Sequence, residues 1–125
     1  MRDPGEKHNR LRVLFVCAFN QWRSPTAEHL YRNDPRLEVR SAGVRSGARR
    51  RLSSKDLEWA EVVFVMDREQ RRSIHDQFAG QDLPDIRVLE ITEDWPYMDP
   101  RLQEALVLAI ESELAQLLPK AADGF

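Results

Sequence analysis

Apolar runs typical of strands alternate with segments of helical period along this chain of 125 residues. Four runs are typical of strands, and two of them, Leu11–Cys17 and Glu61–Met66, are nearly continuous, which indicates burial on both faces of a sheet. The other two, Leu37–Arg40 and Ile86–Ile91, are shorter or alternate apolar with polar residues. Segments of helical period separate the runs, so we expect a three-layer α/β/α fold with a four-stranded, mostly parallel sheet.

Residues typical of helix ends bound four predicted helices. These helices cover about Ser24 to Asn33, Ser53 to Ala60, Arg68 to Phe78 and Asp99 to Leu118. Ser24 and Asp99 each precede a proline, as an N-cap precedes a first helical position. Ser53 and Asp56 have the spacing of a capping box. The predicted domain, 11–119, lies between a flexible N-terminus, 1–10, and a loose C-terminus, 120–125.

Composition and charge narrow the classes of function. The formal net charge of -2 argues against nucleic-acid binding driven by bulk charge. No apolar run approaches the roughly 20 residues that span a bilayer, and Met1 to Arg10 lack the apolar core of a secretory signal. The single cysteine excludes an internal disulfide and a cysteine-rich zinc site, and it favours a reducing, cytoplasmic setting. The three histidines have no ligand spacing, so we expect no metal and no cofactor.

The segment between the first predicted strand and Pro25 predicts a phosphate-binding loop. It consists of Cys17, Ala18, Phe19, Asn20, Gln21, Trp22, Arg23 and Ser24. A buried strand, a short turn and a helix start leave successive backbone N–H groups pointing into one concavity, where an oxyanion can bind. The same positive field, beside the protonated Arg23, favours the thiolate of Cys17 and makes it a nucleophile at neutral pH.

Leu11–Ser41 resembles the start of the low-molecular-weight protein tyrosine phosphatases, in which a strand leads into Cys-x5-Arg-Ser/Thr. The other pieces of the family pattern follow here in order as Pro25-Thr26-Ala27-Glu28, Ser41-Ala42-Gly43, Arg51-Leu52-Ser53, Phe64-Val65-Met66-Asp67 and Glu93-Asp94-Trp95-Pro96-Tyr97. The resemblance covers nearly the whole chain between the termini. It implies a phosphomonoesterase, above all a protein tyrosine phosphatase, that forms a phosphocysteine.

The resemblance also implies a role for each loop residue. Cys17 would attack phosphorus, Arg23 would clamp two equatorial oxygens, and the backbone N–H groups from Ala18 to Ser24 would hold the rest. The Ser24 hydroxyl would donate to the sulfur. Asn20 would fix the loop, since asparagine tolerates a left-handed backbone. The substrate would be a phosphorylated protein or a small phosphomonoester.

Two aspartates compete for the role of general acid. Asp94 precedes Trp95-Pro96-Tyr97 and resembles the family's Asp-Pro-Tyr loop, so it is favoured. Asp99 is better explained as a helix N-cap, and Glu93 is a third candidate. Asp67 also has two interpretations, which can both hold: it would support the phosphate-binding loop, and it would cap the third helix.

Three departures from the family pattern concern the pocket and its redox chemistry. Trp22 stands where many members have a second cysteine, so a protective disulfide with the nucleophile is absent. Phe19 replaces a small residue. Only a short Ser/Gly/Arg link joins Gly43 to Arg51, so we expect a pocket that is open or rebuilt from Trp22, Trp95 and Tyr97.

Several alternatives remain open from sequence. The basic run Arg45, Arg49, Arg50 and Arg51 is interpreted as a solvated loop or as a docking site for a phosphorylated partner. A non-catalytic phosphate-binding module is the alternative function, although a binder needs no nucleophile. A phosphatase for small metabolites or nucleic-acid ends would share the loop chemistry. The related arsenate reductases need additional cysteines, which this chain does not have.

Overall fold

A four-stranded sheet forms the centre of the computed structural model, which describes residues 10–119. The strands are β1 (Leu11–Cys17), β2 (Leu37–Gly43), β3 (Val62–Val65) and β4 (Asp85–Val88). They stand in the order β2-β1-β3-β4, and every pair is parallel. The expectations for the two termini concern residues that, apart from Arg10, lie outside the described range.

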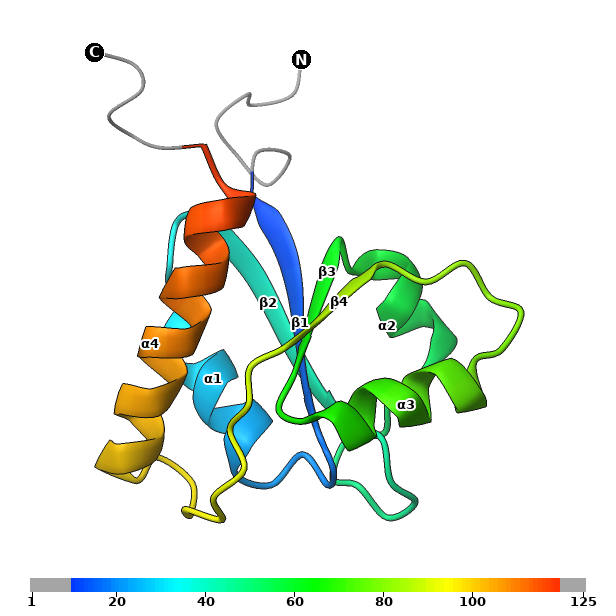
Figure 1. The fold of residues 1–125 in the computed structure, drawn as a ribbon, viewed down its shortest axis with the longest axis horizontal. Helices are drawn as coiled ribbons and strands as arrows, with labels where there is room; N and C mark the ends of the chain where they lie inside the picture. The colour runs from blue at the N-terminus through cyan, green and yellow to red at the C-terminus, as the bar shows by residue number, and fades with distance from the viewer. Residues whose placement is uncertain (1–9, 120–125) are drawn as a thin grey trace.

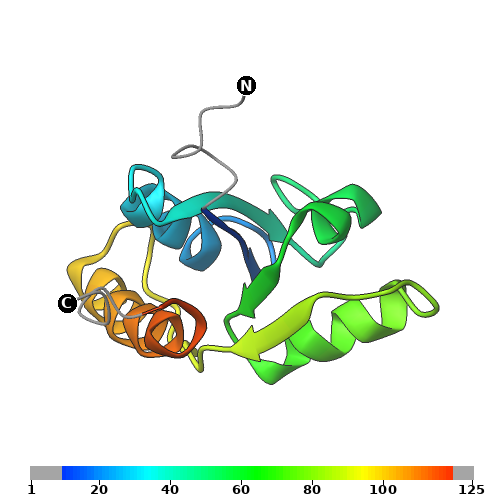
Figure 2. The same ribbon diagram turned by 90° about the horizontal axis from the view of Figure 1, so that it is seen from above.

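Helices cover both faces of this sheet, which confirms the predicted three-layer fold. They are α1 (Arg23–Tyr31), α2 (Ser54–Trp59), α3 (Arg68–Gln77) and α4 (Pro100–Leu117). Helices α1 and α4 lie together on one face, and α2 and α3 lie on the other (Figures 1 and 2). Among residues 10–119, no helix has both the length and the apolar character needed to cross a membrane.

The side chains of β1 alternate between two hydrophobic clusters. Val13 and Phe15 pack in the cluster under α1 and α4, whereas Leu14 and Val16 pack in the cluster under α2 and α3. All four side chains are fully buried, which explains why this run is continuously apolar. Because β1 is central, its carboxyl end lies where open α/β sheets bind their ligands.

Most predicted helix starts are confirmed, and one is wrong. Ser53 and Asp56 form the predicted capping box, and Asp99 caps α4 by accepting from the Arg101 N–H at 2.8 Å. Ser24, however, is not the N-cap of α1. The helix begins two residues earlier, at Arg23 rather than Pro25, Trp22 occupies the cap position, and the Ser24 hydroxyl contacts Cys17 instead.

Strand β2 is three residues longer than the Leu37–Arg40 predicted from its apolar pattern. It continues through Ser41-Ala42-Gly43, which pair in parallel register with Phe15, Val16 and Cys17. The register places Gly43 directly beside the carboxyl end of β1. This strand therefore forms one wall of the loop that follows Cys17.

Candidate active site

Cys17 is the last residue of β1, and its sulfur meets the hydroxyl of a residue in the first turn of α1. The Sγ atom lies 2.9 Å from Ser24 Oγ, and both residues are buried. A thiolate has no proton to give, so in that state the hydroxyl is the donor and stabilises the charge on sulfur. This contact is the one expected for Ser24.

A buried network continues from this pair to the edge of α1. Asn20 Nδ2 donates to Ser24 Oγ and to Ser41 Oγ, at 2.9 Å each. Ser41 in turn donates to the Glu28 carboxylate. Asn20 adopts a left-handed backbone, with φ of 55°, as predicted for a residue that shapes the loop. Its side chain therefore ties the middle of the loop to α1 and β2.

Ser41 and Glu28 were not among the predicted site residues. Both belong to pieces of the family pattern, the Ser-Ala-Gly and the Pro-Thr-Ala-Glu, to which the sequence alone assigned no role. Gly43, in the same Ser-Ala-Gly, permits a close approach of the loop. A Cβ atom at Gly43 would lie 2.7 Å from the Ala18 carbonyl oxygen and 2.9 Å from the Asn20 nitrogen.

The backbone N–H groups of the loop are free to bind an anion. Within residues 10–119, those of Ala18, Phe19, Asn20 and Gln21 donate to no backbone or side-chain acceptor. Buried or recessed N–H groups are almost always paired, so four successive unpaired donors beside a cysteine form a nest for an oxyanion. The nest lies directly before α1, whose first-turn N–H groups add to the positive field.

Two groups outside the loop contact the Arg23 guanidinium. Its Nη1 donates to the Ile91 carbonyl at 2.8 Å and lies 3.5 Å from Asp67 Oδ2. Asp67 also caps α3 by accepting from the Gln70 N–H, which confirms the N-cap interpretation of this residue. These contacts use one nitrogen of the guanidinium, whose other donors remain available for an anion.

Cys17, Arg23 and Asp94 line one cavity of about 360 Å³. Its remaining lining residues are Ala18, Phe19, Gln21, Trp22 and Arg45. The predicted nucleophile, clamp and favoured acid are therefore brought together, although Asp94 is far from the other two in sequence. Trp95, a predicted pocket wall, packs against the hydrophobic core instead and is not among the lining residues.

Contacts distinguish the two candidate acids. Both Asp99 oxygens accept hydrogen bonds from the Arg101 side chain, which lowers the pKa of Asp99 to about 2. A general acid has to carry a proton when the leaving oxygen departs, and these hydrogen bonds oppose protonation of Asp99. The Asp94 carboxylate, in the described part of the chain, forms no hydrogen bond or ion pair, and it faces the cavity of Cys17.

The segment that carries Asp94 is anchored on α1. Thr26 Oγ1 accepts a hydrogen bond from the Met98 N–H at 2.9 Å and donates to the Trp22 carbonyl at 2.6 Å. Gln103 Nε2 donates to the Met98 carbonyl at 2.8 Å. One threonine thus connects the end of the phosphate-binding loop with the segment before α4.

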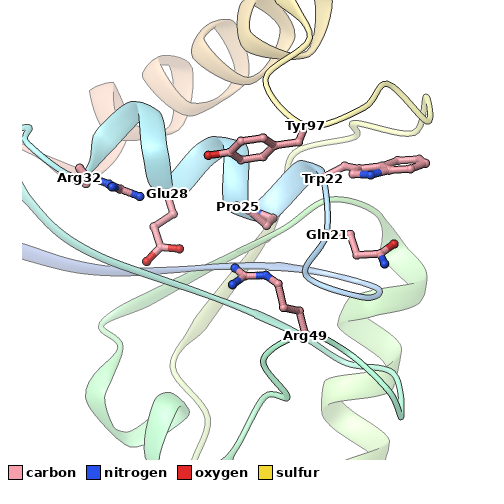
Figure 3. Close-up of a pocket in the computed structure, with 7 residues that line it drawn as sticks. All are labelled: Gln21, Trp22, Pro25, Glu28, Arg32, Arg49 and Tyr97. Carbon is pink, nitrogen blue, oxygen red and sulfur yellow. The ribbon is translucent and has the colours of Figure 1, made fainter.

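A second cavity, of about 510 Å³, adjoins the first (Figure 3). Its lining residues are Gln21, Trp22, Pro25, Glu28, Arg32, Arg49 and Tyr97. Gln21 and Trp22 line both cavities and form their common wall. Figure 3 shows the Tyr97 ring above α1 and the Arg49 side chain rising from below the loop. Of the predicted pocket aromatics, Trp22 lines both cavities, whereas Tyr97 lines only the second.

Scans of protein-family models and of curated protein sequences find no match to this chain. Solved structures do match. The low-molecular-weight protein tyrosine phosphatase SP-PTP from Streptococcus pyogenes is 16% identical, with a TM-score of 0.68 over 88% of this chain and 95% of that one. The YwlE arginine phosphatase from Geobacillus stearothermophilus is 26% identical, with a TM-score of 0.59 over 86% and 96%.

A protein tyrosine phosphatase from Entamoeba histolytica, with Hepes in its active site, is 21% identical, with a TM-score of 0.64 over 86% of this chain and 96% of that one. These three proteins are phosphatases of small size whose chains are covered almost completely. The TM-scores and coverages show that this chain shares their fold.

Proposed function

We propose that this chain, which has the fold of the low-molecular-weight protein tyrosine phosphatases, is a cysteine-dependent phosphomonoester hydrolase. One observation carries the proposal: Cys17, Arg23 and Asp94 line the same cavity, beside four unpaired backbone N–H groups. A nucleophile, an anion clamp and an acid are the parts that phosphoryl transfer to sulfur requires.

In the first step the Cys17 thiolate attacks phosphorus, and the bond from phosphorus to the leaving oxygen breaks. The loop N–H groups and the Arg23 guanidinium hold the three equatorial oxygens, where negative charge is spread in the transition state. Asp94 gives its proton to the leaving oxygen, so the alcohol or phenol departs neutral. Ser24 stabilises the sulfur until the bond forms.

In the second step water attacks the phosphocysteine. Asp94, now a carboxylate, takes a proton from this water, and the phosphorus–sulfur bond breaks to release inorganic phosphate and the thiolate. A covalent intermediate is supported by a matched structure, 23% identical, of a cysteine-to-serine mutant of the YwlE arginine phosphatase with a phosphorylated active-site serine.

The cavity walls favour an aryl phosphate, and hence phosphotyrosine. Phe19 and Trp22 line the cavity and are 43% and 42% exposed, so their rings are accessible to a substrate ring. Offset or edge-to-face contact between aromatic rings contributes about 0.5–1.5 kcal/mol beyond burial of area. Since one matched protein is an arginine phosphatase, phosphoarginine is the natural competitor to test.

Steady-state hydrolysis of an aryl phosphate by wild type, Cys17→Ser and Asp94→Asn tests the proposal. We expect the Cys17 variant to be inactive and the Asp94 variant to lose about 10²–10³-fold in kcat, since general acid catalysis contributes about 10²–10⁴-fold. Phosphotyrosine peptide and phosphoarginine are compared in the same assay, and the peptide should have the higher kcat/KM.

A wild-type protein that binds phosphate and vanadate without hydrolysing aryl, alkyl or arginine phosphates would overturn the enzyme proposal. The alternative of a non-catalytic phosphate-binding module would then stand. An equal loss of kcat/KM in Asp94→Asn for every leaving group would also argue against the acid role, because kcat/KM reports the first step and a good leaving group needs less protonation there.

A further inference from the structure

The link after β2 lies against the outer side of the phosphate-binding loop, and it binds four successive loop carbonyls. The N–H groups of Val44 and Arg45 donate to the carbonyls of Cys17 and Ala18, at 3.1 and 2.9 Å. Arg49 supplies the other two donors: its backbone N–H binds the Phe19 carbonyl and its side-chain Nε binds the Asn20 carbonyl, at 3.0 Å each.

These four bonds determine where the loop N–H groups point. In a trans peptide the C=O and the following N–H point in opposite directions, and the described chain contains no cis peptide. Carbonyls of residues 17 to 20 held on the outside therefore turn the N–H groups of residues 18 to 21 inward. Those are four of the loop N–H groups that have no acceptor among residues 10–119.

The peptide between Asn20 and Gln21 differs from the other three. Its carbonyl, which belongs to Asn20, is bound by a side chain rather than by a backbone N–H group. Asn20 itself has a left-handed backbone conformation. The orientation of this peptide therefore depends on a restraint from a side chain, whereas backbone N–H groups restrain the other three. The Arg49 guanidinium supplies that restraint.

We propose that Arg49 is a positioning residue for the phosphate-binding loop: by holding the Asn20 carbonyl, it keeps the Gln21 N–H directed at the bound phosphoryl group. Figure 3 shows the Arg49 side chain lying under the loop, with its guanidinium pointing toward Pro25 and Glu28. Arg49 also lines the second cavity, which shares Gln21 and Trp22 with the cavity of Cys17.

The neighbouring arginines have other partners, which makes the role of Arg49 separable. Arg50 donates to the Ser41 carbonyl at 2.7 Å and to Asp56 at 2.6 Å. Arg51 is exposed and donates to Gln77 at 3.1 Å. The basic run is therefore neither a uniformly solvated loop nor a uniform docking surface. Arg51→Ala is a matched control, since it removes the same charge from the same link without touching the loop.

Titration calorimetry with inorganic phosphate, on wild type, Arg49→Ala, Arg49→Lys and Arg51→Ala, tests this role. Loss of one properly directed donor to an anion should weaken phosphate binding about tenfold in Arg49→Ala. Arg49→Lys keeps the charge but places a methylene where Nε was, so we expect it to be impaired almost as strongly. Arg51→Ala should bind as wild type does.

An amide spectrum separates positioning from mere stability. In ¹⁵N-labelled wild type the Gln21 amide resonance should move when phosphate is added, and this response should be lost in Arg49→Ala while the other loop amides still respond. Wild-type affinity in Arg49→Ala would overturn the proposal, and so would full retention in Arg49→Lys, because charge alone would then suffice. A wild-type protein that binds no phosphate would overturn it too.

This proposal rests on the proposed function only for the identity of the ligand. Phosphate binding requires no turnover, so a protein that binds phosphate through Arg49 but hydrolyses nothing would refute the enzyme and keep the positioning role. Conversely, an active enzyme indifferent to Arg49→Ala would keep the enzyme and refute the positioning role.

Discussion

Replacing Gly43 by alanine should displace the phosphate-binding loop without unfolding the protein. The added Cβ would lie 2.7 Å from the Ala18 carbonyl oxygen, 2.7 Å from the Ala48 Cβ and 2.9 Å from the Asn20 nitrogen. Two of these three atoms are backbone atoms of the loop, and backbone cannot rotate out of the way as the end of a long side chain can. The loop itself has to move.

The size of this displacement sets the expected effect. Ordinary contact begins near 3.4 Å, so the Ala18 oxygen must retreat by about 0.7 Å. A misplacement of about 1 Å at a reacting centre costs about 10²-fold, so we expect kcat/KM to fall about 10- to 100-fold. Overpacking of this kind lowers the free energy of unfolding by about 1–3 kcal/mol, which leaves the chain folded at room temperature.

Steady-state kinetics on an aryl phosphate, with a thermal melt of each variant, measure both effects. Gly80→Ala is the matched control. Gly80 has φ of +88° and no neighbour within 4 Å, so alanine there costs about 1–2 kcal/mol of stability through backbone strain but meets no loop atom. Wild-type kcat/KM in Gly43→Ala would show that the added Cβ does not displace the loop, and an equal loss in Gly80→Ala would show that the effect is not specific to the loop.

Two further predictions concern the carboxylates. Asp99→Ala removes the N-cap of α4, so the melting temperature should fall by a few degrees while aryl phosphate turnover stays within about twofold. A loss of turnover as large as that of Asp94→Asn would instead assign the acid role to Asp99. Arg36 donates to Asp34 and Glu111 and lowers the pKa of both carboxyls below their ordinary values of 3.8 and 4.5. The contribution of these two carboxylates to stability is therefore complete above pH 4.5 and is lost as pH falls through the lowered pKa values. Urea denaturation at about pH 7 and about pH 3 should show that the free energy of unfolding falls more at the lower pH in wild type than in Arg36→Met. Equal losses would contradict this assignment.

The elements that were predictable from sequence are those whose local pattern and tertiary role agree. Strand β1 has the predicted bounds because both of its faces are buried, and a continuous apolar run is then required. The capping box at Ser53 is made by residues three positions apart, so the spacing of Ser53 and Asp56 was enough to predict it. Asp67 was predicted as an N-cap only, and the structure adds Gln70 as its capping-box partner. The clustering of Cys17 with Arg23 followed from the loop pattern.

Elsewhere tertiary contacts outweighed the local pattern. Ser24 before a proline is typical of an N-cap, but its hydroxyl is taken by Cys17 and Asn20, and α1 starts earlier. The last residues of β2 are small and partly polar, and their strand conformation comes from pairing with β1. The contacts of Arg49 with the loop join residues 29 positions apart, and no local pattern encodes them.

The proposed function depends on phosphorylation of Cys17 during turnover. Rapid-quench mass spectrometry of Asp94→Asn mixed with an aryl phosphate detects this phosphorylation. Loss of the acid and base slows breakdown of the intermediate, so we expect one phosphoryl group on the Cys17 peptide within the first turnover, and none in the double variant with Cys17→Ala, which has no nucleophile at this position. Release of phenol and phosphate in successive turnovers with Cys17 unmodified throughout would contradict it.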